Sequence, residues 1–285
     1  MKLLITGSNG FIGSYFISKY RDKYKIKTFS FLNDDIGSLD CYGVDVVIHL
    51  SALVHQMGGA SASEYKRVNV TQTLQLANEA KVKGVRQFLF MSTIKVYGEE
   101  TETKYGQNTI CRPEDEYGKS KLKAELELLK LEDENFKISI IRTPIVYGYG
   151  VKANIKSLVN LVNKVSILPF GNIQNKRSMV YVGNLCHLVD EVIKQNKSGI
   201  FLASDDESLS TTRLIELIAQ GLGKKVYLLR VPFFETILKL FKPSFHKRLY
   251  GSLEVNSKST KEKLNLENPY SVKDAIKLMI KAEEV

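Results

Sequence analysis

Two residues of the sequence have the types and the spacing needed for proton transfer. Tyr117 and Lys121 are four residues apart, so a helix would place the phenol and the ammonium on one face. A free phenol has a pKa of about 10 and is a poor acid or base at neutral pH. Because a nearby ammonium stabilises the phenolate, we expect Lys121 to lower the pKa of Tyr117. The pair predicts a general acid/base centre, with a solvated helix face as the alternative.

A hydroxyl-bearing segment could complete this centre. Ser92 and Thr93 directly follow an apolar run at residues 87–91, which predicts a buried strand. A hydroxyl at the end of that strand could hold a substrate oxygen beside the phenol of Tyr117. This second signal favours a catalytic role for Tyr117 over a solvated helix face.

A glycine-rich loop near the N-terminus is suited to a diphosphate. Gly7, Gly10 and Gly13 follow a short apolar run and open an amphipathic segment. Glycines permit a tight turn and the close approach of a diphosphate, and the N-terminus of the following helix attracts negative charge. The loop predicts a nucleotide cofactor, with a glycine-rich turn that binds nothing as the alternative.

The elements that must position these residues alternate between apolar runs and helical patterns. Buried strands that alternate with helices predict a parallel sheet built from right-handed βαβ units. The predicted fold class is therefore α/β, with a Rossmann-type doubly wound parallel sheet. Strands are expected at residues 2–5, 26–31, 44–50, 87–91 and 138–141, and helices at 11–20, 64–83 and 117–132. In the helix at 64–83, the inward positions would be Val68, Thr71, Leu74, Leu76 and Ala77.

The second half of the chain shows a less regular pattern. Its short apolar runs and amphipathic stretches predict a smaller, irregular α/β domain. Ser210 is a plausible N-cap for one of its helices. Helices are expected at residues 154–165, 183–194, 211–221, 233–241 and 271–282, and strands at 179–182, 199–202 and 226–229.

Composition and charge narrow the classes of protein. Apolar residues make up 44% and charged residues 25%, which is typical of a globular protein and excludes collagen, coiled coil and disorder. The net charge is +10, and residues 151–285 carry 21 basic and 13 acidic side chains against 20 and 18 in residues 1–150. The three cysteines and four histidines lack metal-binding spacing, so no metal is predicted. Without a signal peptide or an apolar run of about 18 residues, we expect a cytoplasmic protein.

Five motifs in order resemble those of the extended short-chain dehydrogenase/reductases, in particular the nucleotide-sugar epimerases, dehydratases and reductases. They are the glycine loop and residues 49–52, 92–98, 117–121 and 142–148. The resemblance covers essentially the whole chain. It implies a nicotinamide-dinucleotide domain at residues 1–150 and about 179–202. A nucleotide-sugar-binding domain would comprise about 151–178 and 203–285.

The resemblance also implies a role for each matching residue. Tyr117 would be the general acid/base, Lys121 would bind the nicotinamide ribose, and Thr93 would orient the reacting oxygen. The cofactor would contact Tyr117 and Lys121. Its other contacts would be Gly7, Asn9, Gly10, Phe11, Ile12, Gly13, Ser30, Leu50, Ser51, Ala52, Ser92, Pro144 and Val146. The UDP-sugar would contact Lys95, Asn154, Pro169, Phe170, Arg177 and Arg248. The arginines suit the diphosphate because a guanidinium donates two parallel hydrogen bonds, whereas Asn154 has helix capping as its alternative role.

The segment after the second strand bears on the choice of cofactor. In NAD enzymes an acidic residue near this point binds the adenine ribose. The strand ends within Ser30-Phe31-Leu32-Asn33 with no carboxylate at the expected place, which favours NADP(H) over NAD(H). Asp34 or Asp35 could still reach the ribose and keeps NAD(H) as the alternative.

Among these enzymes, the second half most resembles bacterial 4-ketoreductases. Those enzymes reduce a UDP-2-acetamido-4-keto-2,6-dideoxyhexose to UDP-N-acetylquinovosamine or UDP-N-acetylfucosamine for surface polysaccharide. A UDP-hexose 4-epimerase acting on UDP-glucose or UDP-N-acetylglucosamine is the alternative. Ile94 and Lys95 stand where dehydratases commonly have an acidic pair, which disfavours a dehydratase. A catalytically silent, cofactor-sensing scaffold is disfavoured because Tyr117 and Lys121 are both present.

Residues 232–253 are apolar with interspersed lysine and arginine. Such a segment favours a lid over the active site, with weak association with a membrane surface as the alternative. No motif for binding nucleic acid accompanies the basic charge, so nucleic acid is not an expected partner. The helices at 64–83 and 117–132 could pair in a homodimer, as in similar enzymes.

Overall fold

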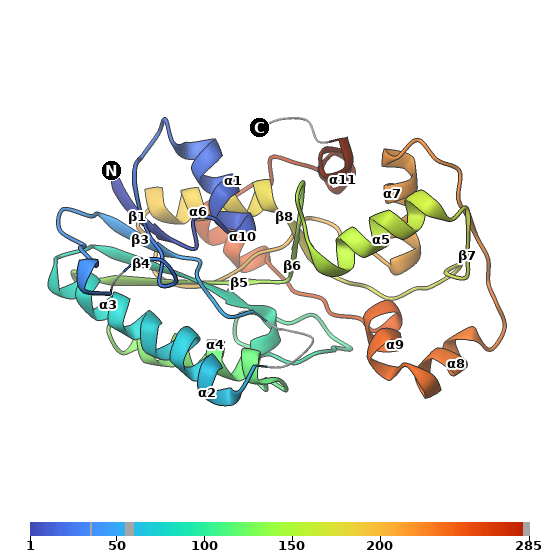
Figure 1. The fold of residues 1–285 in the computed structure, drawn as a ribbon, viewed down its shortest axis with the longest axis horizontal. Coiled ribbons are helices and arrows are strands. Elements are labelled where there is room, and N and C mark those ends of the chain that lie inside the picture. Colours follow the sequence, from blue (N-terminus) through green and yellow to red (C-terminus); the bar gives the residue numbers. More distant parts are fainter. Residues whose placement is uncertain (35, 55–59, 282–285) are drawn as a thin grey trace.

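The computed structural model describes residues 1–34, 36–54 and 60–281 (Figure 1). Its centre is a six-stranded sheet in which every neighbouring pair of strands is parallel. The order across the sheet is β2-β1-β3-β4-β5-β9. The strands are β1 (Lys2–Thr6), β2 (Lys25–Phe29), β3 (Val46–His49), β4 (Gln87–Thr93), β5 (Lys137–Thr143) and β9 (Gly199–Leu202).

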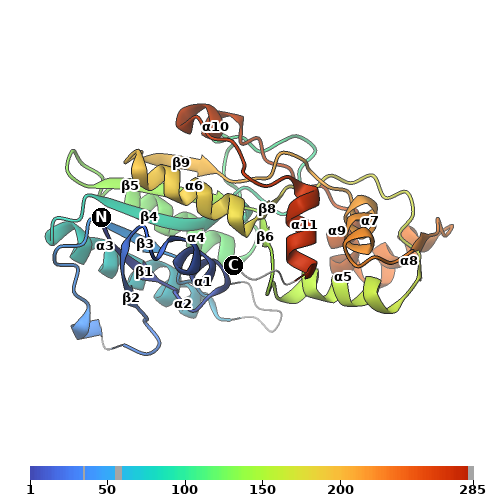
Figure 2. The same ribbon diagram turned by 90° about the horizontal axis from the view of Figure 1, so that it is seen from above.

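Helices cover both faces of this sheet, as Figures 1 and 2 show. Helices α1 (Phe11–Tyr20) and α6 (Val182–Lys194) lie on one face, and α3 (Gln72–Val82) and α4 (Glu116–Leu129) on the other. Alternate strand residues serve the two faces, since Leu3 and Ile5 belong to one apolar cluster and Leu4 to another. The predicted doubly wound α/β sheet is confirmed.

The strand order creates a switch point at β1. The chain passes from β1 through α1 to β2 on one side, and then returns to the other side of β1 as β3. In doubly wound sheets a crevice opens at such a reversal, outside the carboxyl ends of the strands. The glycine loop follows β1 and residues 50–52 follow β3, so both line this edge.

The helix predicted at residues 64–83 is divided into three parts. A capping box between Ser61 and Glu64 starts α2 (Ala62–Tyr65), a π-helical stretch follows at Lys66–Thr71, and α3 completes the segment. The π-turn adds a residue to the helical turn and therefore rotates the inward face. Thr71 is exposed, so its predicted inward position is wrong. The buried positions of the segment include Asn69, Val70, Thr73, Leu76, Ala77 and Ala80.

The second half of the chain adds helices and two short parallel strand pairs. Strand β6 (Ile145–Tyr147) pairs with β8 (Met179–Tyr181), and β7 (Ile167–Leu168) with β10 (Tyr227–Leu228). Ser210 caps α7 (Thr211–Gly221) as predicted, because its hydroxyl accepts a hydrogen bond from the Arg213 amide. The other helices are α5 (Ala153–Lys164), α8 (Phe234–Phe241), α9 (Pro243–Tyr250), α10 (Lys258–Leu264) and α11 (Val272–Lys281).

The molecule is elongated, with the sheet at one end and α5, α7, α8 and α9 at the other (Figure 1). Helix α11 lies between the two ends in both views. The division of the chain into a cofactor domain and a sugar domain stays a prediction. Among the helices of the described residues, none is both long and apolar enough to cross a bilayer.

Candidate active site

The glycine loop is a tight turn pressed against the end of β3. Gly7 has a φ of 71°, and a Cβ on it would lie 2.8 Å from the Ser51 amide nitrogen. A Cβ on Gly13 would lie 2.9 Å from the Cα of Ser8 and still closer to the Gly7 carbonyl oxygen. Among the described residues, no side chain caps the N-terminus of α1, whose N-cap residue is Gly10. The turn therefore presents free amides and a helix dipole at the crevice, which suits a pyrophosphate.

The other expected cofactor residues surround this turn. Leu50, Ser51 and Ala52 are partly exposed at the end of β3, and Asn9 is exposed on the loop. Phe11 and Ile12 are partly buried in the first turn of α1. A Cβ on Gly148 would lie 3.3 Å from the Phe11 ring, so the start of α1 adjoins the segment that carries Pro144 and Val146. Pro144 is buried, and Val146 is partly exposed on β6.

The turn after β2 brings a carboxylate back to the end of that strand. The Asp34 carboxylate accepts a hydrogen bond from the Ser30 amide at 2.7 Å. The carbonyl oxygen of Ser30 in turn accepts from the Asp34 amide at 2.8 Å. An acidic group therefore stands beside Ser30, although the strand itself ends without one. Asp35, the other candidate of the sequence, lies outside the described residues.

Residues of β4 and α4 meet at the same edge of the sheet. Thr93 ends β4 and is 7% exposed. Asp115 caps α4 by accepting a hydrogen bond from the Gly118 amide at 2.7 Å. A Cβ on Gly118 would lie 2.8 Å from the Lys95 carbonyl oxygen, so only glycine lets the first turn of α4 approach the Thr93 turn this closely. This contact brings Tyr117 beside Thr93.

The environment of Tyr117 keeps its phenol protonated. Burial raises the pKa of Tyr117, and the nearby Asp115 and Tyr65 raise it further. A hydrogen bond with the Thr93 hydroxyl acts in the opposite direction, because it stabilises the phenolate. The expectation that the pKa of Tyr117 is lowered is therefore wrong for this structure, where burial outweighs the favourable contacts.

Lys121 is a buried ammonium in an unusual setting. Its side chain is 1% exposed, and Nζ lies 3.8 Å from the centre of the Phe90 ring. Within the described residues, no hydrogen-bond acceptor reaches this nitrogen. Burial lowers the pKa of Lys121 to about 7, although Glu125 raises it. A buried ammonium without acceptors fits a site where ligand hydroxyls, such as those of a ribose, supply them.

A polar network behind Lys121 was not expected from the sequence. Glu125, one turn further along α4, is 1% exposed and pairs with Arg142 at 2.6 Å. The Ser92 hydroxyl donates a hydrogen bond to the same carboxylate. Ser92, predicted to contact the cofactor, is therefore engaged by Glu125. The signal available in the sequence was the i, i+4 spacing of Lys121 and Glu125.

Asn69 is a second residue that the sequence did not reveal. It is buried in the π-helical stretch, and its amide exchanges hydrogen bonds with the backbone of Leu53 at 2.8 and 3.0 Å. It also donates to the Ser120 hydroxyl at 3.0 Å, and Ser120 donates to the Tyr117 carbonyl oxygen. Asn69 thereby ties the loop after β3 to the helix that carries Tyr117. The sequence pattern around Asn69 is mixed polar and apolar, so it does not predict this role.

The expected substrate residues lie in three places: Lys95 beside the catalytic set, Asn154 on α5, and the others around α8 and α9. Near the catalytic set, Lys95 forms ion pairs of 2.7 Å with both Glu99 and Asp115. Asn154 is exposed in the first turn of α5, whose N-cap is Lys152, so the helix-capping alternative is wrong.

The other residues lie around α8 and α9. Arg177 donates hydrogen bonds to the carbonyl oxygens of Lys247 and Gly251 at 3.2 and 3.0 Å. Burial lowers the pKa of Arg177, Glu100 and Glu99 raise it, and the positive charge of Arg248 on α9 lowers it, so all three charged groups lie near this guanidinium. Pro169 is partly buried, and Phe170 is buried against Phe234 of α8 with ring centres 6.1 Å apart.

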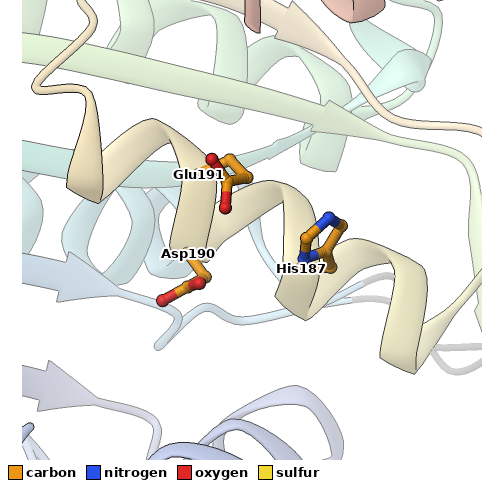
Figure 3. Close-up of side chains that lie close together, drawn as sticks. All are labelled: His187, Asp190 and Glu191. Carbon is orange, nitrogen blue, oxygen red and sulfur yellow. The ribbon is translucent and has the colours of Figure 1, made fainter. Parts of the chain in front are cut away.

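A group of potential metal ligands on α6 is shown in Figure 3. The ligand atoms of His187, Asp190 and Glu191 lie within 4.8 Å of one another. Asp190 is buried and already pairs with Lys23 at 2.7 Å and with Lys194 at 2.9 Å. These ammonium groups supply the positive charge that a metal ion would bring. We therefore interpret His187, Asp190 and Glu191 as part of an ion-pair network and not as a metal site.

Comparisons with known proteins give relatives for this chain. A UDP-glucose 4-epimerase of Vibrio cholerae is 36% identical over 96% of this chain and 93% of its own length. An N-acetyl-alpha-D-glucosaminyl-diphospho-ditrans,octacis-undecaprenol 4-epimerase of Escherichia coli O157:H7 is 26% identical over 81% of this chain and 75% of its own. The solved UDP-N-acetylglucosamine 4-epimerase of Bacillus cereus has a TM-score of 0.80 at 20% identity, covers 100% of both chains, and so shares the fold.

The sequence model of one family matches residues 3–202, from β1 to the end of β9. This range contains the glycine loop, Thr93, Tyr117 and Lys121. The family predicted from the motifs is therefore confirmed, and with it a nicotinamide dinucleotide as the cofactor type. The chain belongs to the NAD dependent epimerase/dehydratase family.

Proposed function

We propose that this protein is a UDP-hexose 4-epimerase. The observation that supports the proposal is that Thr93 at the end of β4 contacts Tyr117, with Lys121 one turn further along α4, at the edge of the sheet where the glycine loop follows β1. The motifs alone favour a 4-ketoreductase. However, the relatives of this chain support the alternative, since the Vibrio cholerae protein is a UDP-glucose 4-epimerase and is 36% identical to this chain over the aligned residues.

The residues divide the work of moving a proton at the sugar C4 oxygen. A dinucleotide held by the glycine loop would supply the acceptor for the C4 hydride and its return to the opposite face of the sugar. Tyr117 takes the proton of the C4 hydroxyl and later gives it back. Thr93 holds the same oxygen, and its hydrogen bond also stabilises the phenolate that Tyr117 must become. Lys121, one turn further along α4, donates hydrogen bonds to ribose hydroxyls, which supply the acceptors that its buried ammonium lacks among the described residues.

The cofactor we favour is NAD(H), because of Asp34. Its carboxylate sits 2.7 Å from the Ser30 amide, at the end of β2 where the adenine ribose binds in this fold. A carboxylate there accepts hydrogen bonds from ribose hydroxyls and repels a 2′-phosphate. The sequence favours NADP(H) because Asp34 is four residues beyond the expected position. In the structure, the turn between Ser30 and Asp34 brings the Asp34 carboxylate back to the end of β2.

A second candidate keeps the same chemistry and changes the carrier of the sugar. The Escherichia coli relative is a 4-epimerase of a sugar on undecaprenyl diphosphate. The specific observation in favour is that Phe233, Leu240 and Phe241 are exposed on the segment that adjoins Arg248. An isoprenoid chain would lie on such apolar side chains.

The proposal is tested with purified protein and UDP-glucose, by following UDP-galactose formation with proton NMR. Conversion in either direction supports it, and Tyr117→Phe should reduce turnover by about 100-fold or more while NAD binding persists. Lys119→Met, two residues away on the exposed side of α4, is the matched control and should convert normally. Near-normal turnover by Tyr117→Phe would refute the role of the phenol. Conversion of the undecaprenyl-linked sugar alone would select the second candidate.

A further inference from the structure

The end of the molecule farthest from the sheet carries a group of exposed aromatic and aliphatic side chains. Phe233 is 80% exposed, and Leu240 and Phe241 are each 74% exposed. Ile237 and Phe245 add exposures of 52% and 41%. We call these five residues the α8 patch. Single exposed apolar residues are ordinary, whereas a group of five along α8 and its flanking residues marks a surface that binds something.

The patch does not belong to the core of the protein. On α8, Phe234 and Leu238 are the residues that face inward, and both pack on the main apolar cluster. Phe233, Ile237 and Leu240 follow helical spacing along a separate face that points to solvent. Phe233 also adopts a φ of 62°, a left-handed conformation that is unfavourable for an aromatic residue. The fold thus holds this ring outward at an energetic cost.

The segment of the chain that carries the α8 patch is rich in basic side chains, which we call its basic surround. Residues 224–250 contain seven lysines and arginines against one acidic residue, Glu235. All seven are exposed: Lys224, Lys225, Arg230, Lys239, Lys242, Lys247 and Arg248. This charge argues against a second copy of the chain as the occupant, because a symmetric contact would bring two such surfaces together. It favours an anionic surface with an apolar interior.

We infer that the α8 patch and its basic surround bind the surface of an anionic phospholipid bilayer. The apolar side chains enter the boundary between headgroups and acyl chains, and the lysines and arginines contact the lipid phosphates. Helix α8 has eight residues, so it lies in the interface without spanning it. Because the interaction needs no sugar substrate, it does not depend on the proposed epimerase activity.

The test is flotation of the full chain with vesicles of phosphatidylcholine, with and without phosphatidylglycerol. We expect binding that requires phosphatidylglycerol and that weakens at about 0.5 M salt. The double variant Leu240→Glu/Phe241→Glu should lower the partition coefficient by more than tenfold, since it removes two inserted side chains and adds two negative charges. Val82→Glu, 79% exposed at the other end of the molecule, is the matched control and should bind normally.

Circular dichroism and NAD binding show whether each variant is folded, so that loss of flotation can be assigned to the surface. Absence of flotation of the wild type, or equal flotation of the double variant, would overturn the inference. So would a dimer in light scattering that the double variant dissociates without any vesicle binding, because a second copy would then cover the patch. Slower hydrogen exchange in residues 233–241 with UDP-sugar and no vesicle binding would assign the segment to a lid.

Discussion

Lys121→Met should make the cofactor-free protein more stable and inactive at the same time. The pKa of Lys121 falls from an ordinary 10.5 to about 7 because the side chain is buried. Each tenfold change in proton affinity corresponds to about 1.4 kcal/mol. Burying the charged form therefore opposes folding by roughly 5 kcal/mol, and methionine fills the same space without a charge.

The sign of the pH dependence follows from the direction of the pKa change. Below about pH 7, Lys121 is charged in both the folded and the unfolded chain, so the full penalty applies. Between about pH 7 and 10.5 the unfolded chain binds the proton and the folded chain does not. The stability of the wild type then rises by about 1.4 kcal/mol per pH unit from this group. The advantage of Lys121→Met is thus largest below about pH 7 and is smaller by roughly 3 kcal/mol at pH 9.

Urea unfolding measures this difference in the absence of cofactor. The chain has no tryptophan, so far-ultraviolet circular dichroism is the suitable signal. Lys119→Met is the matched control, because Lys119 is exposed on the same helix and its pair with Glu116 is exposed as well. A Lys121→Met variant that is less stable than the wild type near pH 7, or a difference that does not change with pH, would refute the reasoning.

Three further predictions concern the cofactor site and the network behind it. Asp34→Asn should shift the ratio of NADP to NAD affinity by at least about tenfold toward NADP, because it removes a charge that repels the 2′-phosphate; titration calorimetry with an unchanged ratio would speak against the role of Asp34. Gly13→Ala should weaken NAD binding and lower the free energy of unfolding by about 1–3 kcal/mol, since its Cβ would meet the backbone of Gly7 and Ser8; unaltered binding would mean that the turn can relax. Glu125→Gln should destabilise the protein by about 3–5 kcal/mol in urea unfolding, because it leaves the buried Arg142 without its carboxylate; a loss below about 1 kcal/mol would show that the pair is dispensable.

The sequence predicts most of the sheet because its signals are local. The apolar runs that become β1, β3 and β4 are short and continuous, as expected for strands covered on both faces. The carboxyl ends of parallel strands share one edge, so the glycine loop and Thr93 could be placed together without coordinates. Ser210 was also predictable, because a cap acts within one turn of its helix.

The features that the sequence did not reveal depend on contacts between distant segments. The turn that brings Asp34 back to Ser30 is short in sequence. Its importance for cofactor binding depends on the position of β2 in the sheet, which is not a local property. The pair between Glu125 and Arg142 joins α4 to β5, and nothing in either motif points to the other. The raised pKa of Tyr117 has the same origin, since burial is a property of the assembled fold.

The central claim is that hydride leaves and returns to the same C4 carbon, and an isotope label tests it most directly. UDP-glucose with deuterium at C4 should be converted to UDP-galactose that retains the deuterium at C4, with no net consumption of reduced dinucleotide. Mass spectrometry and NMR of the product locate the label. An unconverted UDP-hexose, together with stoichiometric oxidation of reduced dinucleotide by a UDP-4-keto-6-deoxy-N-acetylhexosamine, would contradict the account and identify a 4-ketoreductase.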